Sequence, residues 1–157
     1  MSDDTNNLIS YRRSRFSTHL PASRLYTPSH AWLEERGDGV WRVGVTKFAT
    51  RMLGEMVDHA FDIQSDATVE CGQILGWLEG FKAITDIYCV VDGHFIGGNV
   101  GLKQQIALVN KQPYSEGWLY EAAGKADDRC IDVHEYMAFL DRAIDKILEK
   151  EQNADNP

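Results

Sequence analysis

The sequence predicts a mainly β domain that ends in an amphipathic helix. From Tyr26 onward, short runs of β-forming residues alternate with turn residues, as in small β-proteins. After Val133 the apolar residues are spaced three and four apart, which is the period of one helix face. The chain has 157 residues, of which 43% are hydrophobic and 25% charged, so one compact domain with its own core is expected.

The two ends of the chain differ from this domain in composition. Residues 1–24 are polar and keep neither helical nor strand periodicity for long, so we interpret them as an N-terminal extension, mobile or laid over the body. Its segment 11–16 mixes aromatic residues with arginines and could dock on an acidic partner, although a solvated tail is the simpler interpretation. The domain itself is expected over residues 25–150, and residues 151–157 are expected to fray.

A hairpin followed by a short helix is expected near the start of the domain. Residues 31–35 and Val40–Val45 flank a loop with two glycines, which suits a tight antiparallel connection. Thr46 is a candidate N-cap for a helix that runs through Leu53, and Gly54 stands where a C-terminal glycine belongs.

Further short elements are expected before the C-terminal helix. A tight turn is predicted at Asp92 and Gly93, and residues 97–99 are predicted to end the strand that follows it. A short helical segment is predicted over 102–108. The remaining strands are predicted at 56–61, 68–69, 73–78, 84–91, 94–96 and 118–121.

The C-terminal region carries one apolar stripe with helical spacing. Asp132 and Glu135 form a capping-box-like start, and Lys146 and Lys150 complement the dipole at the other end. The stripe is expected to lie on the β-body. It consists of Val133, Tyr136, Met137, Leu140, Ile144, Ile147 and Leu148.

Composition argues against several classes of function. A formal net charge of −8, with basic residues clustered only at 12–15, disfavours nucleic acid and anionic membranes as partners. No apolar run approaches the roughly 20 residues that span a bilayer. Asp3 and Asp4 stand where a signal peptide would carry positive charge, so a cytoplasmic protein is expected.

The cysteines and histidines do not form a recognisable catalytic or metal-binding motif. The three cysteines, Cys71, Cys89 and Cys130, lack the paired spacing of zinc sites and redox dithiols, so reduced thiols and no metal are expected. An enzyme that uses a histidine as a base has three candidates, at positions 30, 59 and 94. No nucleophile motif, carboxylate pair or phosphate-binding loop accompanies them, so no catalytic residue is assigned and a non-enzymatic role is favoured.

The most informative segment is the predicted hairpin tip that contains Glu79, Gly80, Phe81, Lys82 and Ala83. A lysine projected from such a tip can be modified by a ligase that recognises the hairpin, and it can carry a long arm away from the body. On these five residues alone, an unmodified surface lysine is the better interpretation.

The wider sequence resembles the H-protein family of the glycine cleavage system over residues 26–121, and less firmly through Tyr136. The ordered set of motifs is specific, although no single motif is. In order they are Tyr26-Thr-Pro-Ser-His-Ala-Trp32, Val43-Gly-Val-Thr46, Leu53-Gly54, Glu79-Gly-Phe-Lys-Ala83, Asp92-Gly93 with Asn99, and Asn110-Lys-Gln-Pro-Tyr-Ser-Glu-Gly-Trp118.

This resemblance implies a flattened β-barrel of two sheets, the barrel-sandwich hybrid of lipoyl domains, and lipoic acid joined to Lys82 by an amide bond. It implies a carrier with a swinging arm that is not itself catalytic. The partners implied are a lipoate ligase or lipoyl transferase that recognises the hairpin, dihydrolipoamide dehydrogenase, and the enzymes that load and unload the arm. A biotin carrier is disfavoured, because such carriers favour Met beside the modified lysine.

Departures from the family pattern bear on what the arm carries. The usual Ser and Val before the lysine are Gly80 and Phe81, the usual Glu of the first motif is Ala31, and a frequent His is Met52. His30, Ala31 and Met52 form a possible cleft for the arm. Because Ala31 and Met52 replace the usual Glu and His, this cleft lacks the polar partners that a cationic amine would need.

The departures favour lipoate-binding relatives in sulfur oxidation, which serve a heterodisulfide-reductase-like complex. The alternative is the glycine cleavage H-protein, which carries an aminomethyl group from the decarboxylase to the aminomethyltransferase.

Overall fold

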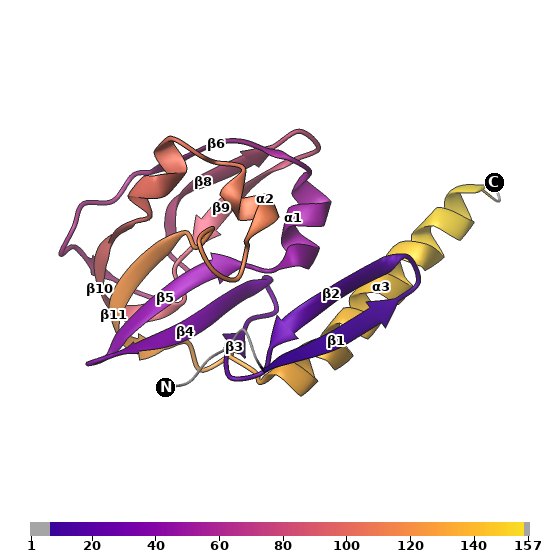
Figure 1. The fold of residues 1–157 in the computed structure, drawn as a ribbon, viewed down its shortest axis with the longest axis horizontal. Coiled ribbons are helices and arrows are strands. Elements are labelled where there is room, and N and C mark those ends of the chain that lie inside the picture. Colours follow the sequence, from indigo (N-terminus) through magenta and orange to yellow (C-terminus); the bar gives the residue numbers. More distant parts are fainter. Residues whose placement is uncertain (1–6, 156–157) are drawn as a thin grey trace.

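The computed structural model describes residues 7–155. Two β-sheets form one end of the molecule, and a separate hairpin lies along the long C-terminal helix at the other end (Figure 1). The predicted mainly β fold with short helices and a C-terminal helix is confirmed.

The larger sheet has six strands in the order β3-β4-β5-β11-β10-β7, and every pairing in it is antiparallel. The predicted hairpin is present as β4 and β5, in which Trp32 is opposite Gly44. Gly44 is needed there, because a Cβ atom at this position would lie 2.5 Å from the Trp32 ring. The strands are β3 (Leu25–Tyr26), β4 (Ala31–Gly37), β5 (Val40–Val45), β7 (Thr68–Val69), β10 (Val91–Gly98) and β11 (Tyr120–Ala126).

The smaller sheet, with strand order β6-β8-β9, faces the larger one. Its strands are β6 (Met56–Phe61), β8 (Ile74–Gly80) and β9 (Ile84–Tyr88). Side chains such as Leu75 and Leu78 of β8 and Phe95 of β10 are 2% exposed or less and form one core with Val43 and Tyr120. The short helices are α1 (Lys47–Leu53), η2 (Val100–Lys103) and α2 (Leu108–Lys111).

The turn predicted at Asp92 and Gly93 is wrong, because both residues lie inside β10. Gly93 is opposite Gly124 of β11, and a Cβ atom on Gly93 would lie 1.9 Å from the Ala123 carbonyl oxygen. The glycine thus allows a close approach of two strands. The predicted strand over 84–91 ends at Tyr88, the helical segment 102–108 is replaced by η2 and α2, and the strand predicted at 118–121 begins at Tyr120.

The N-terminal extension contains two strands that the sequence did not predict, β1 (Leu8–Arg13) and β2 (Phe16–Pro21). The alternation of buried and exposed residues in β2 covers only a short segment. Phe16, Thr18 and Leu20 are buried, and the residues between them are exposed. Residues 1–6 lie outside the described part of the chain.

The C-terminal helix, α3 (Val133–Asp155), is longer than expected and extends into the segment for which fraying is predicted. No Gly or Pro occurs between Val133 and Pro157. The capping box is confirmed: the Glu135 N–H donates to Asp132 Oδ1 at 2.8 Å, and the Asp132 N–H donates to Glu135 Oε1 at 3.5 Å.

The hairpin β1–β2, helix α1 and helix α3 share a second core. Phe16, Leu20, Phe48, Tyr136 and Leu140 are each at most 7% exposed in this cluster. No helix in the described residues 7–155 has the length and apolar character required to span a membrane.

Candidate functional site

Lys82 lies at the tip of the β8–β9 hairpin with its side chain exposed. The tip is the predicted pentapeptide. Glu79 and Ile84 form the last pair between β8 and β9, Gly80 is buried, and Phe81 and Ala83 are exposed. Phe81 is 80% exposed, which is unusual for so large an apolar side chain.

Backbone hydrogen bonds join this tip to the end of α1. The Lys82 N–H donates to the Leu53 carbonyl at 2.8 Å, and the Phe81 N–H donates to the Glu55 carbonyl at 2.9 Å. Within the tip, the Gly80 N–H donates to the Ala83 carbonyl at 2.9 Å. The lysine backbone is therefore fixed, and only its side chain is free to move.

Two glycines make this close approach possible. Gly54 has φ +84°, a conformation that side chains rarely adopt, and a Cβ atom there would lie 3.0 Å from Lys82 Cγ. A Cβ atom on Gly80 would lie 2.2 Å from the Leu53 carbonyl oxygen. The Leu-Gly motif and the lysine motif, distant in sequence, are thus parts of one site.

Asn110 holds the same segment from the other side. Its Nδ2 donates to the Gly54 carbonyl at 3.1 Å, and its Oδ1 accepts from the Met56 N–H at 2.9 Å. Asn110 begins the last motif of the sequence analysis. Three separate motifs therefore converge around Lys82.

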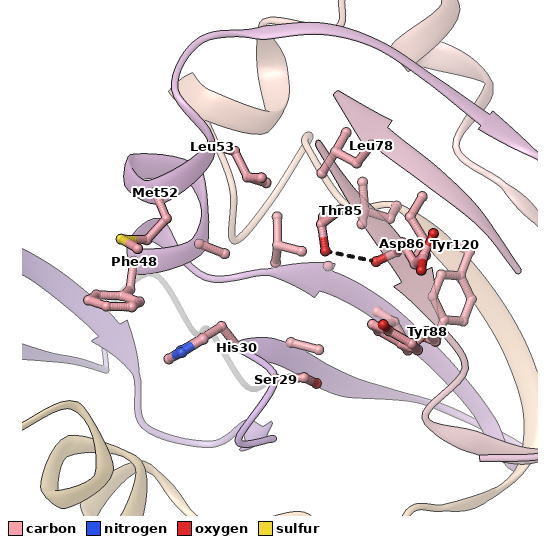
Figure 2. Close-up of a pocket in the computed structure, with 17 residues that line it drawn as sticks. Ser29, His30, Phe48, Met52, Leu53, Leu78, Thr85, Asp86, Tyr88 and Tyr120 are labelled. Atoms are coloured by element: carbon pink, nitrogen blue, oxygen red, sulfur yellow. Dashed lines mark hydrogen bonds between the residues drawn. The ribbon is translucent and has the colours of Figure 1, made fainter. Parts of the chain in front are cut away.

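A cavity of about 270 Å³ lies close to this tip, between the two sheets and α1 (Figure 2). Its volume is just below the roughly 300–1,000 Å³ typical of small-molecule sites. Most of its wall is apolar, with Phe48 and Met52 of α1 on one side and Leu78 and Ile87 of the smaller sheet on another.

His30 lines the cavity as a neutral residue. Its Nδ1 lies 2.8 Å from the Tyr136 hydroxyl, which also lies 2.8 Å from the Thr46 hydroxyl. Burial lowers the pKa of His30 to about 4. Thr46 is the N-cap residue of α1 as predicted, but its side chain makes no capping bond and contacts Tyr136 instead.

The structure brings together all three predicted cleft residues, because Ala31 and Met52 also line the cavity. Met52 is 50% exposed and lines both this cavity and the neighbouring groove that contains Lys82. The other two histidine candidates, His59 and His94, do not line the cavity.

Sequence reasoning missed the polar residues Ser29, Thr85 and Asp86 of the wall (Figure 2). Asp86 lies on β9 four residues after Lys82, on the strand that leads away from the tip. Asp86 is exposed whereas the adjacent Ile87 is buried, so its carboxylate is on the solvent side of the strand, at the edge of the cavity.

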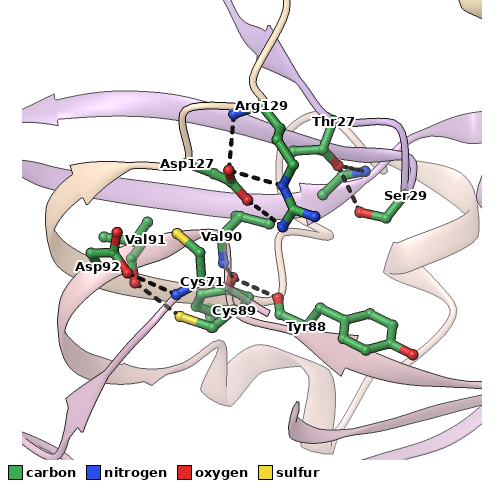
Figure 3. Close-up of polar contacts among 12 residues, drawn as sticks. Thr27, Ser29, Cys71, Tyr88, Cys89, Val90, Val91, Asp92, Asp127 and Arg129 are labelled. Carbon is green, nitrogen blue, oxygen red and sulfur yellow. Dashed lines mark hydrogen bonds and ion pairs between the residues drawn. The ribbon is translucent and has the colours of Figure 1, made fainter. Parts of the chain in front are cut away.

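The three cysteines are free thiols in the structure. Burial raises the pKa of Cys71 to about 12 and that of Cys130 to about 11, and it also raises the pKa of Cys89. Cys71 and Cys89 lie near the ion pair of Asp127 and Arg129 (Figure 3). Within residues 7–155, no group of three His, Cys, Asp or Glu side chains is arranged to hold a metal ion.

A two-sheet body that displays one lysine on a rigid hairpin tip beside an apolar cavity is the architecture of carrier domains. The sequence profile of the glycine cleavage H-protein family matches residues 24–140. This chain belongs to the glycine cleavage H-protein family.

Individual relatives agree with this assignment. The glycine cleavage system H protein of Sodalis glossinidius (strain morsitans) is 34% identical over 127 residues, covering 79% of this chain and 96% of the relative. That of Pseudoalteromonas atlantica is 35% identical over 111 residues, covering 71% and 84%. The crystal structure of a glycine cleavage system H protein from Mycobacterium marinum matches with a TM-score of 0.69 and 28% identity, covering 76% of this chain and 97% of that one.

Proposed function

We propose that this chain is a non-catalytic carrier with lipoic acid joined to Lys82 by an amide bond. The observation that supports this most is the position of Lys82: a rigid, exposed tip, bonded to the end of α1 and next to an apolar cavity. Such a tip suits recognition by a lipoate ligase, and the cavity suits an apolar chain. Amidation removes the lysine charge, so the arm has no charge to desolvate against these walls.

The bound lipoyl group would supply a strained disulfide that a nucleophile can open by thiol–disulfide exchange. The protein residues position the root of the arm and shield its far end from water. Tethering keeps the group at high effective concentration for each enzyme that docks.

The glycine cleavage system is the favoured pathway for this carrier. The relatives described above are glycine cleavage H proteins, whereas the sulfur-oxidation assignment favoured by the sequence gains no support from them. Ala31 and Met52 do leave parts of the wall apolar, but Ser29 and Thr85 supply polar groups in the same cavity, and the exposed Asp86 lies at its edge. We propose that the Asp86 carboxylate compensates the charge of an aminomethyl-loaded arm, working with cytoplasmic glycine cleavage enzymes.

Sulfur oxidation with a heterodisulfide-reductase-like complex stays the second candidate. It is favoured by Ala31 and Met52 in the wall and by the neutral state of His30, none of which offers charge to an amine. An uncharged sulfur-bearing arm needs no such partner.

Intact mass tests the carrier role. Co-expression with a lipoate ligase is expected to add one lipoyl mass to the wild type and none to Lys82→Arg, which keeps the charge of the tip. Lipoylation of Lys82→Arg would contradict the site.

A reconstituted glycine cleavage assay tests the pathway. Lipoylated protein is expected to turn over with the decarboxylase and aminomethyltransferase, and Asp86→Asn is expected to lower turnover about two- to fivefold, as loss of an exposed charge partner does. Asp66→Asn, an exposed residue outside the cavity, serves as the matched control. Poor turnover by the wild type, together with normal reduction by dihydrolipoamide dehydrogenase, would instead favour the sulfur pathway.

A further inference from the structure

A groove of about 620 Å³ runs beside Lys82, between hairpin β1–β2, helix α1 and helix α3. We call it the basic groove. Its floor is apolar and includes Phe16, Phe48 and Ile144, and its rim includes Arg15, Arg51 and Lys82. One acidic residue, Glu151 of α3, also lines it.

Much of the basic groove comes from segments outside the family match. The match covers residues 24–140, whereas Arg15 and Phe16 lie in the N-terminal hairpin and Ile144 and Glu151 lie beyond residue 140. The hairpin is fastened to α3 by Tyr11, which donates to Asp141 at 2.8 Å, and by Arg13, which donates two bonds of 2.8 Å to Asp145. This chain has therefore added a second surface next to the lysine of the shared carrier body.

The basic residues of this groove contrast with the net negative charge of the whole chain. The formal net charge is −8, yet Arg15 and Arg51 form no ion pair within the described residues 7–155. Arg13 is different, since Asp145 and Asp141 compensate it. Lipoylation would remove the charge of Lys82 but leave those of Arg15 and Arg51.

We propose that the basic groove is the docking surface for an acidic segment of an enzyme that acts on the arm. This proposal depends on the carrier role of Lys82 proposed above. Carboxylates of the partner pair with Arg15 and Arg51, while an apolar side chain of the same segment enters between Phe16 and Ile144. An apolar centre with a charged rim is the usual anatomy of a protein interface.

Exposed apolar residues continue the surface around the lysine. Met52, which lines the groove, is 50% exposed, and Phe81 is 80% exposed. Apolar groups exposed together in this way mark interaction sites. Arg15 and Arg51, which form no ion pair in the described residues although Arg51 lies 5.9 Å over the Phe16 ring, are too few for a nucleic acid or an anionic bilayer against the net negative charge of the chain. A protein segment is the better fit.

Association rates with purified enzymes test this proposal. The lipoylated double variant Arg15→Glu/Arg51→Glu is compared with the matched control Arg12→Glu/Lys103→Glu, which makes the same charge change at exposed residues outside the groove. The partners are the ligase, the decarboxylase, the aminomethyltransferase and dihydrolipoamide dehydrogenase of the same organism. Intact mass first confirms one lipoyl group on each carrier, which separates failure of the carrier role from failure of the docking surface.

For at least one enzyme, the groove variant is expected to associate roughly tenfold more slowly at low salt, and the control less than about threefold more slowly. The difference should shrink as salt is raised. Unchanged melting curves exclude a folding defect, and Arg15→Gln/Arg51→Gln should show a smaller effect of the same sign. Equal rates for the groove variant and the control with all four enzymes would overturn the proposal. It would also be overturned if backbone NMR signals of Arg15 and Arg51 shift on lipoylation but not on adding any enzyme, because the arm itself would then fill the groove.

Discussion

The N–H of Lys82 and the carbonyl oxygen of Leu53 form a hydrogen bond of 2.8 Å that joins the hairpin tip to the last residue of α1. This bond satisfies one of the carbonyl groups left free at a helix end. The same helix contributes Phe48 and Met52 to the cavity wall. The backbone at Lys82, where the proposed arm is attached, and part of the wall of the apolar cavity therefore belong to one rigid unit.

The first prediction concerns the glycine that permits this bond. Gly80→Ala should lower the free energy of unfolding by about 1–3 kcal/mol, because its Cβ atom would collide with the Leu53 carbonyl. Lipoylation by the ligase should slow as well, since the tip must shift. Gly97→Ala is the control, because nothing lies within 4 Å of its Cβ position. Urea titration and the ligase kcat/KM check both; equal behaviour of the two variants would contradict this view of the tip.

The second prediction concerns the C-terminal helix. Leu140 is fully buried in the second core, so Leu140→Ala should cost about 2–5 kcal/mol of unfolding free energy. Leu148 lies on the same helix but is 38% exposed, and Leu148→Ala should cost under about 1 kcal/mol. Thermal and urea unfolding give the comparison. Similar losses for both would mean that burial of Leu140 in the second core adds no special stability to α3, since Ala is the better helix former at both positions.

The third prediction compares apolar with ionic contributions to the packing of hairpin β1–β2 on α3. Leu20 is fully buried, whereas the Arg13–Asp145 pair is exposed to solvent. Leu20→Ala should therefore cost about 2–5 kcal/mol, and Asp145→Asn less than about 1 kcal/mol. Hydrogen exchange of the β1–β2 amides should rise strongly only in the first variant. If Asp145→Asn lost more unfolding free energy than Leu20→Ala, the Arg13–Asp145 ion pair would be the main contact that holds the hairpin on α3.

Local patterns in the sequence were enough to predict much of the fold. The glycine loop between β4 and β5, the capping box of α3 and the exposed lysine at a tip each depend on neighbouring residues. The same is true of α1, whose boundaries at Thr46 and Gly54 are confirmed.

The remaining features depend on contacts between segments that are distant in sequence. The strands β1 and β2 carry few apolar residues and are stabilised by α3, more than a hundred residues away. Gly93 has a turn-like sequence but serves the approach of β11. The assembly of the site from Gly54, Lys82 and Asn110 likewise requires the folded chain.

The last prediction is a pH dependence from His30, whose pKa burial lowers to about 4 from an ordinary 6.5. Between these values the unfolded chain takes up a proton that the folded chain does not. Stability from this residue is therefore fully present above pH 6.5 and is lost as the pH falls toward 4. At about 1.4 kcal/mol per pH unit, up to about 2 kcal/mol should be lost by pH 5. The carboxylates of Asp127 and Asp145 titrate below this window, because Arg129 and Arg13 lower their pKa values.

The variant His30→Asn isolates this contribution. Asn tolerates the left-handed backbone that His30 adopts, with φ 68°, and it cannot be protonated in this range. Urea unfolding at pH 7 and pH 5 should show a clear loss for the wild type and a smaller one for His30→Asn. Because burial also lowers the pKa of His59, some loss should persist in the variant. If both proteins lost the same free energy between pH 7 and pH 5, His30 would have to be protonated in the folded state, and its proposed role as a neutral part of the cavity wall would be wrong.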